Sequence, residues 1–309
     1  MSADFIPMSS TTIVRKKASV SSSPWRQALQ RLRRDKLAIL GLSILVITLL
    51  LCYIGPLFTS STANRVTASL INKPPSWSHW LGTDAVGRDV FSRLLQGGRI
   101  SIMVGVLSML STIVVGTMVG LLAGFYGRWV DHLVTRIADV FLALPGIPLL
   151  IIFGAILSDL KVPAGYRIYL VILLISLISW PTLALLIRGQ ILSFKERAFM
   201  LATETLGLGN RRKIYHLLLN VTPTIIVIAT LTVGKAILSE TVLSFLGLGV
   251  IPPTPSWGNM LTSANSLIDF QLRPWLWVPP GAAIFITVIS INFLGEGLRD
   301  ALDPKRKGR

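Results

Sequence analysis

The chain alternates between long apolar runs and short polar segments that are rich in Lys and Arg. A run of about 20 apolar residues is long enough to cross a bilayer as a helix. Runs near this length cover residues 37–58, 100–126, 137–157, 168–187, 221–246 and 274–294. Because a backbone in lipid must satisfy its own hydrogen bonds, the pattern predicts an all-α integral membrane protein with six transmembrane helices.

Polar segments flank this set of runs. Residues 1–23 are rich in Ser and Thr, a composition typical of disorder. Residues 24–36 combine a tryptophan with several arginines in the pattern of a basic amphipathic helix. We expect residues 1–36 to form a cytoplasmic N-terminal tail and residues 299–309 a cytoplasmic C-terminal tail, since six spans place both ends on one side.

Two polar connections lie between the first three runs. Residues 59–99 are expected to form an outer connection, in which residues 89–95 have the spacing of a short helix on the membrane surface. Residues 127–136 are expected to form a short loop. Residues 100–298 would then hold the five remaining helices as one core.

Glycine and proline mark special places in this core. Gly116, Gly120 and Gly124 recur at every fourth position, a pattern that lets a second helix approach closely. Pro145 and Pro148 fall inside the third run, where proline is expected to kink or break a helix. We therefore predict close helix packing on the second span and a break in the third.

Composition agrees with a membrane protein. The chain is 52% hydrophobic and 14% charged, whereas a soluble domain carries about 25% charged residues. Its formal charge of +16 comes from Lys and Arg residues that fall mainly between the runs, where they set topology and contact anionic lipid. Membrane lipid, and not nucleic acid, is therefore the expected partner of these charges.

The most basic connection, residues 188–220, lies between the fourth and fifth runs. Residues 196–206 have the composition of a short helix, and Gly207 is placed to end it. Its six Lys and Arg residues put the segment on the cytoplasmic side by the positive-inside rule. We interpret it as a handle through which a protein outside the membrane moves the helices inside it.

The sequence contains no convincing catalytic or metal-binding pattern. Residues 82–89 have the glycine spacing of a phosphate-binding loop, but Arg88 and Asp89 stand where Lys and Ser or Thr are required. Lys235 and Glu240 are charged residues inside the fifth run, where a charge must face protein or water. They either line a pathway, brace its outer gate or make a structural contact between helices.

Three ordered segments make the chain resemble a known family. They are LGTDAVGRDVFSRLLQGGRIS (81–101), SETVLSFLGLGVIPPTPSWGNML (239–261), and PWLWVPPG with NFLGEGLRDALDP (274–281 and 292–304). In these segments the chain resembles the permease subunits of the dipeptide, oligopeptide and nickel branch of ATP-binding-cassette (ABC) importers. Its short first tail and modest first outer connection resemble the C-type component.

This resemblance implies the type I permease fold of ABC importers in a bacterial inner membrane. It implies a complex with a second homologous permease subunit, two cytoplasmic ATPase subunits and an extracytoplasmic substrate-binding protein. ATP and magnesium would bind to the ATPase subunits, so this chain is expected to bind no cofactor or metal and to catalyse no reaction. The expected cargo is a di- or oligopeptide, for which the chain would form half of the pathway.

The resemblance also gives residues 188–220 a role as the loop that couples the permease to its ATPases. The family has a Glu-Ala-Ala motif followed four residues later by Gly. Ala202 and Gly207 fit this motif, whereas Leu201 replaces the Glu and Thr203 replaces the second Ala. Glu204, near the same helix turn, is a candidate to supply the missing acidic contact.

Two alternatives stay open on the sequence alone. The first is a permease of the same family that carries a nickel chelate or another small solute. The second is a stand-alone secondary transporter, which would need an ion site at the middle of the membrane and usually has internal repeats. The sequence shows no internal repeat and few acidic residues in its apolar runs, and this favours the ATP-driven importer.

Overall fold

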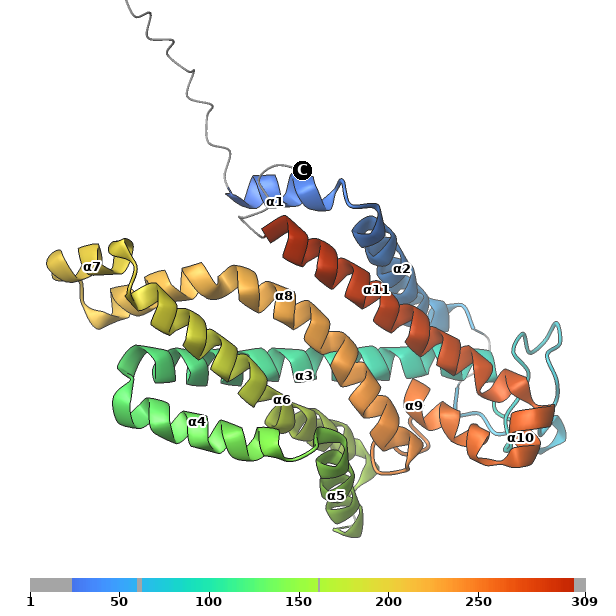
Figure 1. Cartoon of the computed structure of the whole chain (residues 1–309). Coiled ribbons are helices and arrows are strands. Elements are labelled where there is room, and N and C mark those ends of the chain that lie inside the picture. The colour runs from blue at the N-terminus through green and yellow to red at the C-terminus, as the bar shows by residue number, and fades with distance from the viewer. Residues whose placement is uncertain (1–23, 60–62, 161, 303–309) are drawn as a thin grey trace, which may run out of the picture.

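The computed structural model describes residues 24–59, 63–160 and 162–302, and these ranges contain helices and turns but no strand (Figure 1). The α-helices are α1 (Pro24–Leu32), α2 (Lys36–Ile54), α3 (Val90–Tyr126), α4 (Arg128–Ala143), α5 (Gly146–Asp159), α6 (Ala164–Lys195), α7 (Ala198–Thr205), α8 (Asn210–Phe245), α9 (Trp257–Met260), α10 (Leu267–Leu272) and α11 (Val278–Leu302). The short 3-10 helices are η1 (Gly55–Leu57), η2 (Ala68–Leu70), η3 (Leu261–Asn265) and η4 (Pro274–Leu276).

In the described part of the chain, five helices are long and apolar enough to cross a membrane, and a bent pair of helices can form a sixth span. The five are Lys36–Leu57, Val90–Tyr126, Ala164–Lys195, Asn210–Phe245 and Val278–Leu302. The bent pair is α4 with α5, which meet at an angle of 87°. The predicted all-α membrane architecture is therefore confirmed, with the third run as its irregular member.

The third run breaks at its first proline. Leu144, the residue before Pro145, ends α4 in an extended conformation, because a proline forces the preceding residue out of helical geometry. Pro148 lies in the first turn of α5, where a missing N–H removes no helical hydrogen bond. The prediction of a loop over residues 127–136 is wrong: the turn is confined to Gly127, with φ +63°, and Arg128, with φ +46°, and Arg128 is already the first residue of α4.

The prediction of a separate surface helix at residues 89–95 is also wrong. Those residues are the first turns of α3, which Asp89 caps by accepting a hydrogen bond from the N–H of Ser92 at 2.8 Å. The 37 residues of α3 span about 55 Å, compared with a hydrocarbon layer of about 30 Å. The core therefore begins ten residues earlier than position 100, and α3 is longer than the layer is thick.

Gly97 and Gly98 lie inside α3 and do not interrupt the helix. They permit close packing of other segments against it. A Cβ atom at Gly97 would lie 3.1 Å from the carbonyl carbon of Ser256. A Cβ atom at Gly98 would overlap Sγ of Cys52 and lie 2.7 Å from the ring of Trp257. Cys52 itself is 3% exposed. Glycine is therefore needed where α2 and the connection after α8 press against α3.

Three further boundaries differ from the sequence pattern. Residues 188–220 consist mostly of the end of α6, all of α7 and the start of α8, so little of the segment is a loop. The connection over residues 247–273, which is rich in proline, contains the short helices α9 and α10. The last helix runs to Leu302, so the first residues of the expected C-terminal tail continue α11.

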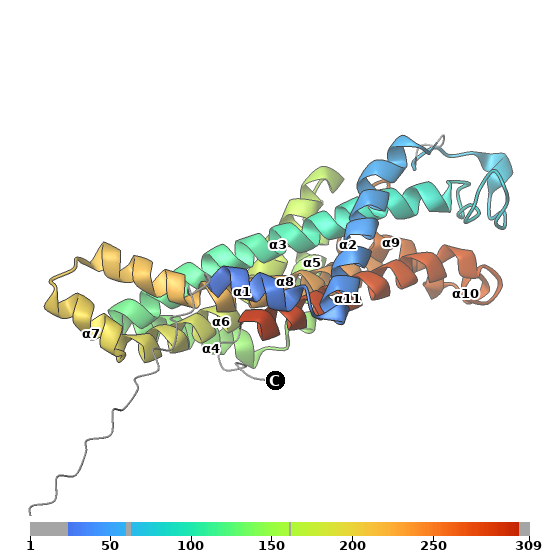
Figure 2. The same ribbon diagram turned by 90° about the horizontal axis from the view of Figure 1, so that it is seen from above.

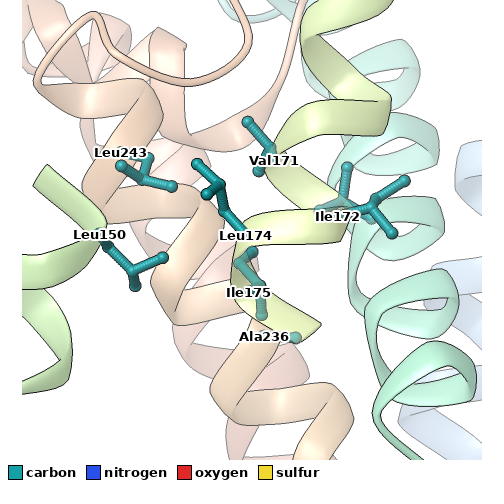
Figure 3. Close-up of a cluster of buried hydrophobic side chains, with 8 residues drawn as sticks. Leu150, Val171, Ile172, Leu174, Ile175, Ala236 and Leu243 are labelled. Carbon is teal, nitrogen blue, oxygen red and sulfur yellow. The ribbon is translucent and has the colours of Figure 1, made fainter. Parts of the chain in front are cut away.

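The long helices α3, α6, α8 and α11 run along one common direction, with α7 at one end of the molecule and α10 at the other (Figure 2). The main apolar cluster lies between α3, α5, α6 and α8 (Figure 3). Its buried members are Val104, Leu150, Val171, Ile172, Leu174, Ile175, Ala236 and Leu243. At the periphery α1 packs on α11 through the buried Ala28, and Asp35 caps α2. The long helices thus connect the two ends of the molecule through one packed interior.

Candidate functional site

The helix α7 lies at the extreme end of the molecule, between the last turn of α6 and the first turn of α8 (Figure 1). It has eight residues, too few to form a stable helix without tertiary support. It ends before Gly207, whose φ of +66° is a conformation that only glycine adopts readily. Its stability and orientation must therefore come from its contacts with α6 and α8.

Met200 supplies the central contact of α7. Its side chain is 2% exposed and belongs to an apolar cluster with residues of α6 and α8. The other buried members of this cluster are Leu183, Ile187, Ile191, Leu217 and Val221. Thr203, one turn later, is also buried and donates from Oγ1 to the carbonyl oxygen of Met200 at 2.6 Å. One face of α7 is thus inserted between α6 and α8.

Aromatic contacts complete this junction. The rings of Phe194 in α6 and Phe199 in α7 lie 6.4 Å apart in an edge-to-face arrangement. The guanidinium group of Arg197 lies over the ring of Phe194, 4.6 Å from its centroid. The turn between α6 and α7 is therefore held by side chains from both helices.

The residues of the predicted coupling motif divide between the two faces of α7. Thr203 faces the cluster, whereas Ala202 is exposed on the free face. The side chains of Leu201 and Glu204 lie outside the described part of the structure. Sequence reasoning missed Met200, although its spacing of three residues from Thr203 puts both on one helical face.

The three glycines of α3 lie against α6. A Cβ atom would be 2.9 Å from the Leu183 side chain at Gly116 and 2.7 Å from the Ile191 side chain at Gly124. At Gly120 it would overlap the carbonyl oxygen of Ala184, which is backbone and cannot rotate away. These contacts bring the backbones of α3 and α6 close together along the half of α6 that leads to α7.

Replacing Gly120 by alanine is therefore expected to separate α3 from α6 and to lower stability by about 1–3 kcal/mol. Gly189 of α6 offers a matched control, because a Cβ atom there would have no atom within 4 Å. Gly189→Ala should be neutral or stabilising by up to about 1 kcal/mol. Thermal unfolding of the purified protein in detergent measures both variants, and equal melting temperatures would contradict the close approach at Gly120.

At the other end of α8, the carboxyl group of Glu240 is fully buried. Its Oε2 accepts a hydrogen bond from Ser101 Oγ at 2.9 Å, and its Oε1 accepts one from Ser244 Oγ at 2.7 Å. Ser101 Oγ accepts from the N–H of Trp257 at 3.1 Å, and Ser244 Oγ accepts from the N–H of Val250 at 2.9 Å. Each hydroxyl thus donates and accepts, and one carboxyl group joins α3, α8 and the connection that follows α8.

The connection held by these bonds, residues 247–260, is called the plug segment below. Trp257 in it is 1% exposed and donates from Nε1 to the carbonyl oxygen of Leu94 at 2.9 Å. A Cβ atom at Gly258 would lie 2.8 Å from Cβ of Ser244. The plug segment therefore fits closely between α3 and α8, and the hydrogen bonds of Glu240 lie at its centre.

The structure separates the two charged residues of the fifth run. Lys235 and Glu240 are five residues apart, about 140° around the helix, so they point to different sides of α8. Lys235 is exposed, and no described residue forms a hydrogen bond or an ion pair with it. Glu240 is thus a contact between elements, whereas Lys235 lies on a free surface. Among the described residues, no group of His, Cys, Asp and Glu is arranged to hold a metal ion.

Comparison with known proteins places these features in a family. Residues 116–308 match the model of the binding-protein-dependent transport system inner membrane component. Residues 23–75 match the N-terminal transmembrane domain of oligopeptide transport permease C. The two matches together cover α1 and α2, the last part of α3 and the helices from α4 to α11.

Three similar relatives are permease proteins of bacterial transport systems. The dipeptide permease protein DppC of Alkalihalophilus pseudofirmus is 42% identical, over 92% of this chain and 91% of the relative. The oligopeptide permease protein OppC of Bacillus subtilis is 39% identical, over 92% and 91%. The glutathione permease protein GsiD of Pectobacterium atrosepticum is 38% identical, over 92% of both chains. The chain therefore belongs to the family of binding-protein-dependent transport system inner membrane components, as a C-type permease subunit of an ABC importer.

Proposed function

We propose that this subunit forms half of the pathway through which an ATP-driven importer takes up di- or oligopeptides. The other half would come from a second homologous permease subunit. Two cytoplasmic ATPase subunits would bind ATP and magnesium, and an extracytoplasmic binding protein would deliver the peptide. The substrate class is supported by the relatives, which are named for transport of dipeptides, oligopeptides and glutathione.

The end of the molecule that carries α7 is assigned to the cytoplasm. The basic residues Arg211 and Arg212 are exposed at this end, at the start of α8, as the positive-inside rule requires. The plug segment and α10 lie at the opposite end and would then face the outside (Figure 1). We propose with this orientation that both chain ends are cytoplasmic, as six spans, an even number, require.

The observation that carries the proposal is that one helix, α8, connects the two ends. Leu217 and Val221 near its start belong to the same buried cluster as Met200 of α7. Near its other end, Glu240 accepts from the two serine hydroxyls that hold the plug segment. Leu217 and Glu240 are 23 residues apart, a distance of about 35 Å along the helix. Displacement of α7 by an ATPase subunit would therefore be transmitted along α8 to the plug segment, with bending at Pro223 inside the helix absorbing part of the motion.

Reconstitution of the whole complex tests the proposal. Proteoliposomes with both permeases, the ATPases and the binding protein are expected to take up a labelled tripeptide only when ATP is present on the side of α7. A complex without this chain serves as the control. Uptake of a nickel chelate and no peptide would overturn the substrate class, and uptake by this chain alone would overturn the ATP-driven mechanism.

Lys235 is proposed to line the pathway, because it is exposed on a membrane-spanning helix and has no partner in the described chain. Lys235→Glu reverses the charge at this surface. We expect the uptake of a lysine-rich tripeptide relative to a glutamate-rich one to rise about three- to tenfold. Lys235→Arg keeps the charge and should keep the wild-type ratio. An unchanged ratio in Lys235→Glu would place this residue away from the pathway.

A further inference from the structure

A bidentate ion pair connects α6 to α4 near the cytoplasmic end. Arg188 of α6 donates from Nε and Nη2 to the two carboxyl oxygens of Asp131, and the Nη2–Oδ2 distance is 2.7 Å. Two parallel bonds of this kind fix the relative orientation of the groups as well as their separation. The side chains are 30% and 20% exposed, so water competes with the pair only in part.

A second contact connects the last residue of α6 to the end of α3. Lys195 Nζ donates to the carbonyl oxygens of Phe125, at 2.9 Å, and Gly124, at 3.5 Å. It also lies over the ring of Phe125, 5.8 Å from its centroid. The final carbonyl groups of a helix lack partners and carry partial negative charge, so an ammonium group binds there favourably.

These two contacts are seven residues apart on α6, about 10 Å along the helix. Between them Ile191 packs against Gly124, where glycine permits the close approach described above. A single contact would let α6 pivot, whereas two separated contacts resist both sliding and rotation. The end of α6 is thus attached to the hairpin of α3 and α4, which turns at Gly127.

The attached end of α6 leads directly into α7. Lys195 is the last residue of α6 and Ala198 is the first of α7, so only two residues separate the helices. The contact of Arg197 with Phe194 further stiffens this turn. A force on α7 therefore reaches the Lys195 and Arg188 contacts before any longer flexible segment can absorb it.

We propose that Asp131, Arg188 and Lys195 are positioning residues that make the hairpin of α3 and α4 move together with α7. This inference rests on the proposed function and adds a second route for the ATPase motion, beside the one along α8. Partly exposed ion pairs contribute little to the stability of a fold. Loss of these contacts should therefore reduce the transport obtained per ATP more than it reduces folding.

The test measures peptide uptake and ATP hydrolysis in the same proteoliposomes of the full complex. Asp131→Asn and Lys195→Gln remove one contact each with little change of shape, and a double variant removes both. We expect uptake per ATP to fall about fivefold in each single variant and further in the double variant, with ATP hydrolysis retained. The exchange of Asp131→Arg with Arg188→Asp in one chain should recover at least about half of the wild-type ratio.

Asp269→Asn provides a matched control, because it removes a similarly exposed ion pair with Arg273 in α10, at the far end of the molecule. It should keep the wild-type ratio. Wild-type uptake per ATP in the double variant would overturn the inference while leaving the proposed function intact. A fall in melting temperature with uptake and hydrolysis reduced equally, and no recovery in the exchange, would assign these contacts to folding alone. Failure of the wild-type complex to import peptide would overturn the proposed function itself.

Discussion

Replacing Met200 by aspartate is expected to reduce ATP-driven uptake more than tenfold while the chain still inserts into the membrane and joins its complex. The methionine side chain is 2% exposed and lies in one apolar cluster with Ile187, Ile191 and Leu217 of the neighbouring helices. Burying a carboxylate in such a cluster costs several kcal/mol. The packing of an eight-residue helix cannot offset this cost, so α7 should leave its position between α6 and α8. The membrane-spanning helices keep their own packing and should fold.

Met200→Leu is the matched control, since it conserves volume and apolar character and should retain most of the uptake. The measurement compares peptide uptake, ATP hydrolysis and the amount of assembled complex for the three proteins. Assembly should be similar in all of them, and only the aspartate variant should lose transport. Normal uptake by Met200→Asp would mean that the seating of α7 between α6 and α8 is not needed for coupling.

Replacing Glu240 by alanine is expected to open the outer end of the subunit. The change leaves the hydroxyl groups of Ser101 and Ser244 without their acceptor, at a cost of about 1–3 kcal/mol for each buried group. It also removes the acceptor that orients these two hydroxyl groups, which in turn accept from the N–H groups of Trp257 and Val250 in the plug segment. We expect proteoliposomes without ATP to leak protons at least about fivefold faster than the wild type, and the melting temperature of the complex to fall by about 5–10 °C.

Glu240→Gln keeps the shape of the side chain and changes only its hydrogen bonds, so it distinguishes the effects of the two. The amide keeps one acceptor oxygen but presents an NH₂ group to the second serine, so one of the two hydroxyl donors loses its acceptor. An intermediate leak is therefore expected, between those of the wild type and Glu240→Ala. A leak-free Glu240→Ala complex would show that the plug segment is held closed by other contacts.

The sequence predicted the class of the fold and most of its spans, because the length of an apolar run is set by the bilayer and not by tertiary contacts. It also predicted the break at Pro145, whose ring excludes the helical conformation of the residue before it. The sequence did not predict that α6 is the helix that packs against Gly116, Gly120 and Gly124. A repeat of small residues indicates close packing but does not identify the partner helix.

The errors came from residues whose role is set by packing between distant segments. The second span was expected to start at residue 100, but Gly97 and Gly98 lie inside α3, where Ser256, Cys52 and Trp257 lie against them. Residues 127–136 seemed a loop because they are polar, yet Val130, Val134 and Ala138 give one face an apolar spacing that continues α4. In both cases the local composition was ambiguous and the tertiary contacts decided.

The candidate site was predicted in outline but not in its contacts. The position of α7 and its end at Gly207 follow from local composition, whereas the burial of Met200 depends on residues of α6 and α8. Lys235 and Glu240 had equal standing in the sequence, and only the tertiary structure places one on a surface and the other in a hydrogen-bond network. The pairing of Asp131 with Arg188 joins residues 57 positions apart and leaves no local signal.

Cys52 is buried beneath Gly98, so the native chain should react little with thiol reagents. It is the only cysteine of the sequence and is 3% exposed. A membrane-impermeant maleimide should therefore ignore the unmodified protein and report any cysteine introduced at an accessible position. The opening and closing of each helix face during the ATP cycle can thus be mapped by labelling, without first removing a native sulfhydryl.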